Sequence, residues 1–231
     1  MRFLLSVPLL VVATLGLGIP AVVAGLLDRR GEVSWRIARR WGRVVLWAWG
    51  VRVAVIAETS PRGPVIYAVN HGSVLDIPVL FAHLPGSFRI MHKRSLYLLP
   101  LIGLYLYSGG HIGIDRGKAF RARKSLDEAA RRIAAGTSVA AFPEGTRSAD
   151  GSVRPFKKGS FVLAIQAGVP VVPVSLSGVQ RVAPRGLFRL RPGELAMTLH
   201  APVPTAGRCL EEAGALAEQV REIVARGCAA A

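Results

Sequence analysis

Residues 65–76 of this chain read Val-Ile-Tyr-Ala-Val-Asn-His-Gly-Ser-Val-Leu-Asp, and this stretch decides the fold. Its first five residues form an apolar run of strand-forming side chains, and a polar loop follows at once. A strand that is apolar on both faces belongs in a sheet that is covered on both sides, as the parallel sheets of α/β proteins are. We therefore expect a buried strand here, with polar residues at its carboxyl end.

Similar short apolar runs recur along the chain and alternate with helical patterns. The predicted strands are residues 51–57, 65–69, 88–91, 111–114, 138–142, 171–176 and 195–200. Helical periodicity covers residues 119–135 and 211–226, where Leu216, Val220, Ile223 and Val224 form one apolar stripe. This alternation predicts an α/β fold over residues 51–231: a mixed, mostly parallel sheet flanked by helices.

The N-terminus differs in texture, because residues 3–27 carry no charged side chain. A helix of that length would be roughly 37 Å long, enough to cross a hydrocarbon core. Pro8, Gly16, Gly18 and Pro20 interrupt the run, so it fits either a tilted, kinked span or a hairpin-like segment within one leaflet. A signal peptide is the rival interpretation, since residues 22–24 resemble a small-residue cleavage site.

Positive charge gathers just after this apolar run. The chain has 30 Lys and Arg against 14 Asp and Glu, for a formal charge of +16. Six arginines follow the run closely: Arg29, Arg30, Arg36, Arg39, Arg40 and Arg43. This asymmetry favours a cytoplasmic membrane location, with the domain that follows on the cytoplasmic face. Residues 1–50 are thus predicted to be membrane-anchoring helices.

All four tryptophans fall within residues 35–49, beside these arginines. Indole rings next to cations suit the headgroup layer of a bilayer. The alternative is a helix that packs on the domain through its aromatic residues, and both can hold. Nucleic-acid binding would instead predict stacking aromatics on a basic face of the main domain, so we expect no nucleic-acid partner.

The two cysteines, Cys209 and Cys228, form no CxxC pair and no Cys/His ligand cluster. We therefore expect neither a disulfide framework nor a metal site.

Asn70-His71 and Asp76 form the first polar block. Five residues apart, His71 and Asp76 would not share a helix face, but they can meet if His71 lies on the loop and Asp76 opens the next helix. A carboxylate could then hold one imidazole nitrogen while the other faces a substrate hydroxyl, as in a hydrolase triad without its serine. The alternative is a structural hydrogen-bonding histidine.

Two further blocks also follow apolar strands. Residues 109–116 end in Asp115-Arg116, and residues 142–147 read Phe-Pro-Glu-Gly-Thr-Arg. At the carboxyl edge of an α/β sheet, Arg116 and Arg147 could bind an anion, while a glycine at 145 allows close backbone approach. The alternatives are a surface ion pair and a turn with a neutralised Glu-Arg pair.

A fourth block, residues 169–174, reads Val-Pro-Val-Val-Pro-Val and is interpreted as a buried edge-type strand with a packing role. Together the four ordered blocks resemble those of the glycerolipid acyltransferases, most closely the 1-acyl-sn-glycerol-3-phosphate acyltransferases, over roughly residues 50–200. Two features depart from that pattern: His111 stands where an apolar or aromatic residue is usual, and residues 91–96 match only loosely.

The resemblance implies that His71 is a general base and that Asp76 orients it. It also implies that Arg116, Glu144, Thr146 and Arg147 bind the acceptor's glycerol phosphate in a pocket shaped by Gly145. The donor would be acyl-CoA or acyl-carrier protein, the acceptor lysophosphatidic acid, and the product phosphatidic acid, with no metal or other cofactor. Two alternatives are acylation of a different lysolipid, such as a lyso-ornithine lipid, and a non-catalytic membrane-binding pseudoenzyme.

Overall fold

The computed structural model describes residues 2–28, 31–115, 119–148, 150–183 and 190–229. Within them a seven-stranded sheet has the order β1-β7-β6-β2-β5-β3-β4. The strands are β1 (Val51–Ala57), β2 (Ile66–Val69), β3 (Phe88–Lys93), β4 (Ile112–Ile114), β5 (Ser138–Ala141), β6 (Val171–Ser177) and β7 (Gly193–Leu199). Each strand predicted from the sequence is confirmed, with ends that differ by two residues or fewer.

Most of the sheet is parallel. The strands β6, β2, β5, β3 and β4 run the same way. The strand β7 is antiparallel to β6, and β1 pairs with β7 in parallel. The carboxyl ends of β2, β5 and β3 therefore meet at one edge of the sheet, and the polar blocks that follow them are brought together there.

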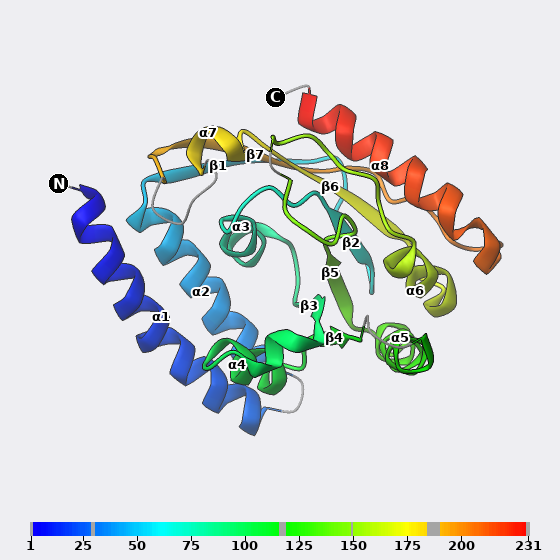
Figure 1. Ribbon diagram of the computed structural model, residues 1–231, viewed down its shortest axis with the longest axis horizontal. Helices are drawn as coiled ribbons and strands as arrows, with labels where there is room; N and C mark the ends of the chain where they lie inside the picture. The colour runs from blue at the N-terminus through cyan, green and yellow to red at the C-terminus, as the bar shows by residue number, and fades with distance from the viewer. Residues whose placement is uncertain (1, 29–30, 116–118, 149, 184–189, 230–231) are drawn as a thin grey trace.

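Helices cover both faces of the sheet (Figure 1). They are α1 (Arg2–Leu27), α2 (Glu32–Ala48), α3 (Asp76–His83), α4 (Ile102–Ser108), α5 (Ala119–Ala134), α6 (Gly159–Ala167), α7 (Val179–Val182) and α8 (Ala213–Ala229), with 3-10 helices η1 (Arg94–Leu98) and η2 (Leu210–Glu212). One apolar cluster joins the sheet to α2, α3 and α7, and a second joins it to α5, α6 and α8. The predicted α/β class, a mostly parallel sheet flanked by helices, is confirmed.

The interpretation of residues 169–174 as an edge-type strand is wrong. β6 lies inside the sheet, between β7 and β2. Pro173 is tolerated there because its carbonyl accepts a hydrogen bond from the backbone N–H of His200, one residue beyond the end of β7. The N–H and carbonyl of a strand residue point to the same side, so the N–H that Pro173 lacks would have pointed toward β7, just beyond its last residue. The hydrogen bonds between β6 and β2 are therefore unaffected.

The N-terminal apolar run forms one continuous helix, α1, with Pro8 and Pro20 inside it. A hairpin within residues 3–27 is therefore wrong. The reversal comes after Leu27, and α2 returns alongside α1 (Figure 1). In α1, Pro8–Leu27 is long and apolar enough to cross a membrane, and it is the one such helix among the described residues. The predicted boundary near residue 50 falls between α2 and β1.

The tryptophans of α2 divide between the two roles predicted for them. Trp35, Trp41 and Trp49 pack against the apolar cluster under α2, whereas Trp47 is 75% exposed. The arginine-rich helix is thus docked on the domain through most of its indole rings and presents one of them outward.

Candidate active site

His71 and Asp76 meet at the carboxyl end of β2. His71 lies two residues beyond that strand, and Asp76 is the first residue of α3. The Nδ1 atom of His71 is 2.7 Å from Oδ2 of Asp76. A carboxylate can only accept, so Nδ1 carries the proton and Nε2 is left as a basic nitrogen. The contact proposed from the sequence, loop histidine to helix-start aspartate, is present.

Asp76 is fully buried, and its position is fixed by the backbone. The same Oδ2 atom accepts hydrogen bonds from the N–H groups of Gly72 (2.8 Å) and Ser73 (2.9 Å). These donors hold the carboxylate in a tight turn beneath the imidazole. The imidazole is therefore oriented by a carboxylate that is itself held in one orientation.

The loop after β5 contacts His71 through a ring stack and two hydrogen bonds. The ring of Phe142 stacks on the imidazole, with centroids 4.1 Å apart and an interplanar angle of 26°. The carbonyl of His71 accepts from the N–H of Ser148 at 2.7 Å, and its own N–H donates to Oε1 of Glu144 at 2.9 Å. His71 and Glu144 are 73 residues apart in sequence, and their two blocks thus form one structural unit around the histidine.

Asn70 joins this unit to β6. Its side-chain amide donates to the carbonyl of Leu176 at 2.9 Å and accepts from the N–H of the same residue at 2.7 Å. A buried side chain here completes a strand-like pair of hydrogen bonds just where β2 ends. The start of the His71 loop is thereby anchored to the sheet.

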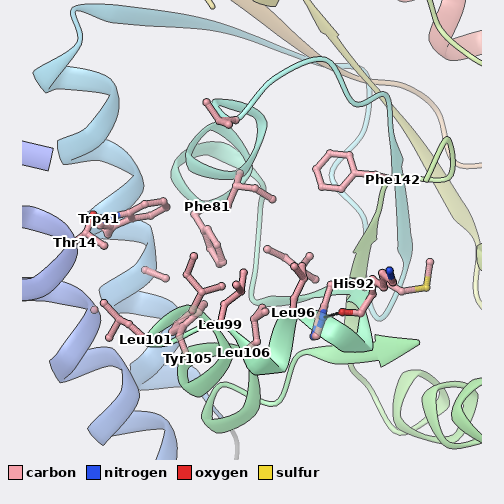
Figure 2. A pocket seen from close by; sticks show the side chains of 18 of the residues that line it. Thr14, Trp41, Phe81, His92, Leu96, Leu99, Leu101, Tyr105, Leu106 and Phe142 are labelled. Atoms are coloured by element: carbon pink, nitrogen blue, oxygen red, sulfur yellow. Dashed lines mark hydrogen bonds between the residues drawn. The ribbon is translucent and has the colours of Figure 1, made fainter. Parts of the chain in front are cut away.

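A cavity of about 580 Å³ opens beside His71. It extends from His71, Phe142 and Arg147 to the space between α1 and α2, where Thr14 and Trp41 line it. Figure 2 shows Phe142 and Trp41 on opposite sides of the cavity, with leucines of η1 and α4 between them. Most of its lining is aliphatic or aromatic, which suits a hydrocarbon chain rather than a polar ligand.

The predicted anion-binding residues fall in different places. Arg147 is exposed and lines the cavity on the side of His71, and Gly145 lines it with a φ of 77° that favours glycine. Thr146 is exposed and accepts a bond from Arg154 at 3.3 Å. Arg116 lies outside the described residues.

Glu144 is buried and is not among the residues that line the cavity. Its side chain is buried, and burial raises the pKa of its carboxyl, while the N–H of His71 acts in the opposite direction. The Oε2 atom has no hydrogen-bond partner among the described residues. Substrate binding by Glu144 stays a prediction, and the contact seen is with the backbone of His71.

The family model for acyltransferases matches residues 52–177, which include every block described above. The chain belongs to the acyltransferase family. A 1-acyl-sn-glycerol-3-phosphate acyltransferase of Chlamydomonas reinhardtii is 36% identical over 206 residues, 87% of this chain and 60% of that protein. Human 1-acyl-sn-glycerol-3-phosphate acyltransferase alpha is 33% identical over 208 residues, 89% of this chain and 74% of the human one.

The crystal structure of the 1-acyl-sn-glycerophosphate (LPA) acyltransferase PlsC from Thermotoga maritima has the same fold. It superimposes with a TM-score of 0.76 at 29% identity, over 99% of this chain and 96% of that one. This chain spans about three fifths of the length of its algal relative, so the similarity to that protein is confined to a shared portion.

Some of the site could not be predicted from the sequence of this chain. The ring of Phe142 contacts His71, and the N–H groups of Gly72 and Ser73 bind Asp76, only once the loops are folded. No sequence pattern predicts these contacts. The sequence also did not predict that α1 forms one wall of the cavity. The small residues Gly18 and Ala21, which line that wall, were the available signal for it. Among the described residues no three His, Cys, Asp or Glu side chains gather as a metal cluster.

Proposed function

We propose that this chain transfers a fatty-acyl group from a thioester donor to the free hydroxyl of a lysophosphatidic acid, forming phosphatidic acid for phospholipid biosynthesis. One observation carries the proposal: a histidine with a basic Nε2, oriented by a buried carboxylate, lines an apolar cavity that Arg147 also lines. The names of the algal, human and Thermotoga proteins support the same acceptor.

In the proposed mechanism, Nε2 of His71 removes the proton of the acceptor hydroxyl as its oxygen attacks the thioester carbonyl. The carbon–oxygen bond forms, the carbon–sulfur bond breaks, and the imidazolium is stabilised by Asp76. His71 then returns the proton to the leaving thiolate, so protons balance without a further reagent. The chemistry as written needs no metal and no organic cofactor besides the donor, acyl-CoA or acyl-carrier protein.

The cavity would hold a hydrocarbon chain, and Arg147 would bind the phosphate of the acceptor through paired hydrogen bonds. The apolar α1 and the arginines that follow it support a location on the cytoplasmic membrane, with the catalytic domain on the cytoplasmic face. Both substrates are amphipathic, so a membrane location brings the acceptor to the site.

The test is thiol release from a long-chain acyl-CoA by the detergent-purified protein, with and without lysophosphatidic acid, beside the His71→Ala variant. We expect acceptor-dependent release that is lost in the variant, with phosphatidic acid as the product. If release fails with acyl-CoA, with acyl-carrier protein and with other lysolipids while the protein is folded, the proposal is wrong and the pseudoenzyme alternative stands. Release with lyso-ornithine lipid but not lysophosphatidic acid would reassign the acceptor.

A further inference from the structure

The segment between β3 and β4 carries an apolar run of its own. From Ser95 to Ile114 there is no Asp, Glu, Lys or Arg, and Lys93 and Arg94 immediately precede the run. A charge-free stretch of this length in a globular domain is expected to be buried. Instead it folds into η1, a turn and α4, on the surface beside α1 (Figure 1).

Residues 96–107 of this segment, here called the hook, have two apolar faces. One face, with Leu96, Leu99 and Leu106, lines the cavity beside His71. The other points away from the protein: Leu98 is 84% exposed, Tyr107 73% and Leu104 59%. These three side chains do not line the cavity, so their exposure has no explanation within the active site.

A sharp turn at Leu101 joins η1 to α4 within the hook. Leu101 has φ 58° and ψ −54°, and the N–H of Ile102 donates to the carbonyl of Pro100 at 2.6 Å. This is a γ-turn of the rare, strained kind, and strain of this sort persists where the surroundings over-determine it. Leu101 lines the cavity beside Gly18 of α1, and the hook is thereby locked to the N-terminal helix.

The hook packs directly against α1, which has exposed apolar side chains of its own. The helices α1 and α4 touch where Gly25 meets the backbone of Ser108, so closely that a Cβ at Gly25 would lie 2.7 Å from the carbonyl carbon. On α1, Leu27 is 80% exposed and Val12 66% exposed. Several exposed apolar side chains gathered on two elements that pack together indicate an interaction surface.

We propose that the hook is a membrane-inserting element, separate from the N-terminal helices, that enters the same lipid leaflet as α1. Leu98, Leu104 and Tyr107 would lie among the acyl chains, and Lys93 and Arg94 would lie at the level of anionic headgroups. The occupant of this surface is a phospholipid bilayer, because the exposed cations that precede the hook complement anionic lipid. Since the hook also forms the cavity wall, its insertion places the cavity at the depth of the lipid tails.

The inference does not depend on the proposed reaction, and its test needs no activity. In the full chain with Cys209→Ser and Cys228→Ala, an environment-sensitive fluorophore is attached to Leu98→Cys. A matched chain carries the probe on Leu210→Cys, a 44% exposed leucine in η2 just before α8, on the other side of the sheet. Vesicles of phosphatidylcholine and phosphatidylglycerol contain lipids brominated at known depths.

We expect a blue shift and depth-dependent quenching of the probe at residue 98, with neither at residue 210. In co-sedimentation with the same vesicles, the Leu98→Asp/Leu104→Asp double variant should bind about ten-fold or more weakly than Leu210→Asp, since burial of each leucine is lost. All three substituted leucines are exposed, so circular dichroism should be unchanged in all variants.

Equal behaviour of the two probes, together with vesicle binding that the double variant does not weaken, would overturn the proposal. A wild-type dimer in detergent that the double variant converts to a monomer, with no quenching at residue 98, would overturn it too and assign the surface to a second copy of the chain.

Discussion

The Nδ1 atom of His71 lies 2.7 Å from Oδ2 of Asp76, and that one oxygen also accepts hydrogen bonds from the N–H groups of Gly72 and Ser73. Three donors therefore converge on a single carboxylate oxygen that is removed from solvent. The arrangement leaves the imidazole only one tautomer that satisfies its neighbour, with the proton on Nδ1. The turn between β2 and α3 thus leaves Nε2 as the unprotonated nitrogen of His71.

Asp76→Asn tests this dependence. The amide could donate to Nδ1 and reverse the tautomer, which would place the proton on Nε2 and remove the base. We expect kcat to fall about 10²–10⁴-fold, the usual size of an acid–base contribution. Asp127→Asn on α5 is the control. An Asp76→Asn rate within a few-fold of wild type would mean that His71 does not need this partner.

Glu144→Ala separates positioning from substrate binding. The variant leaves the partly buried N–H of His71 without its acceptor, at a cost of up to about 1–3 kcal/mol. If Glu144 positions the His71 loop, kcat falls while KM for the acceptor changes little, and Glu144→Gln restores much of the rate because its carbonyl oxygen can accept. A rise in KM with unchanged kcat would instead support the direct substrate contact predicted from the sequence.

Arg147→Ala should weaken binding of the phosphate-bearing acceptor. Hydrogen bonds to charged groups contribute about 1.5–3 kcal/mol, so KM for lysophosphatidic acid should rise roughly 10- to 100-fold, and Arg147→Lys should recover part of this. Steady-state kinetics of Arg52→Ala, an exposed arginine paired with Glu194 on β1 and β7, provide the control. A KM unchanged in Arg147→Ala would place the phosphate elsewhere.

Much of the fold could be predicted because the strands are apolar on both faces and end at polar blocks. The pairing of His71 with Asp76 was also predictable, since a loop followed by Asp-Ile-Pro fixes where the next helix begins. Residues 95–108 yielded no prediction, because an uncharged run without periodicity fits a strand or a helix equally well.

The contact of Glu144 with His71 was not predictable from local pattern. It depends on the register between β2 and β5, in which Ala68 pairs with Ala141 and the loops after both strands are thereby brought level. The same holds for Pro173, whose place inside the sheet depends on where β7 ends. Position in a sheet is a property of long-range pairing, and a proline only restricts it.

Ala21→Phe tests whether the cavity holds the fatty chain. Ala21 is a small, buried α1 residue that lines the cavity, so a phenyl ring there shortens the space. Excluding two methylene groups at about 0.8 kcal/mol each predicts a roughly ten-fold shift in relative kcat/KM toward shorter acyl groups. The same change at the exposed Ala54 on β1 should leave the preference unaltered. An unaltered preference in Ala21→Phe as well would contradict chain binding here.

His111→Asn tests a buried histidine that has no part in the proposed mechanism. Its Nδ1 accepts from the N–H of Ile90 at 2.8 Å, and burial, assisted by the positive charge of Arg89, lowers its pKa well below the ordinary range. The unfolded chain therefore binds a proton near pH 6.5 that the folded chain refuses, so stability is full above that pH and is lost as the pH falls.

Each such group contributes a slope of up to about 1.4 kcal/mol per pH unit below the ordinary histidine pKa. Asparagine retains an acceptor oxygen near the position of Nδ1 but does not titrate. The unfolding free energy of His111→Asn, measured by urea denaturation from pH 7 to 5, should fall less steeply than that of wild type by about that amount. Partial burial lowers the pKa of His83 less than full burial lowers that of His111, so His83→Asn should change the slope less. Identical slopes for wild type and His111→Asn would mean that this imidazole accepts a proton without unfolding.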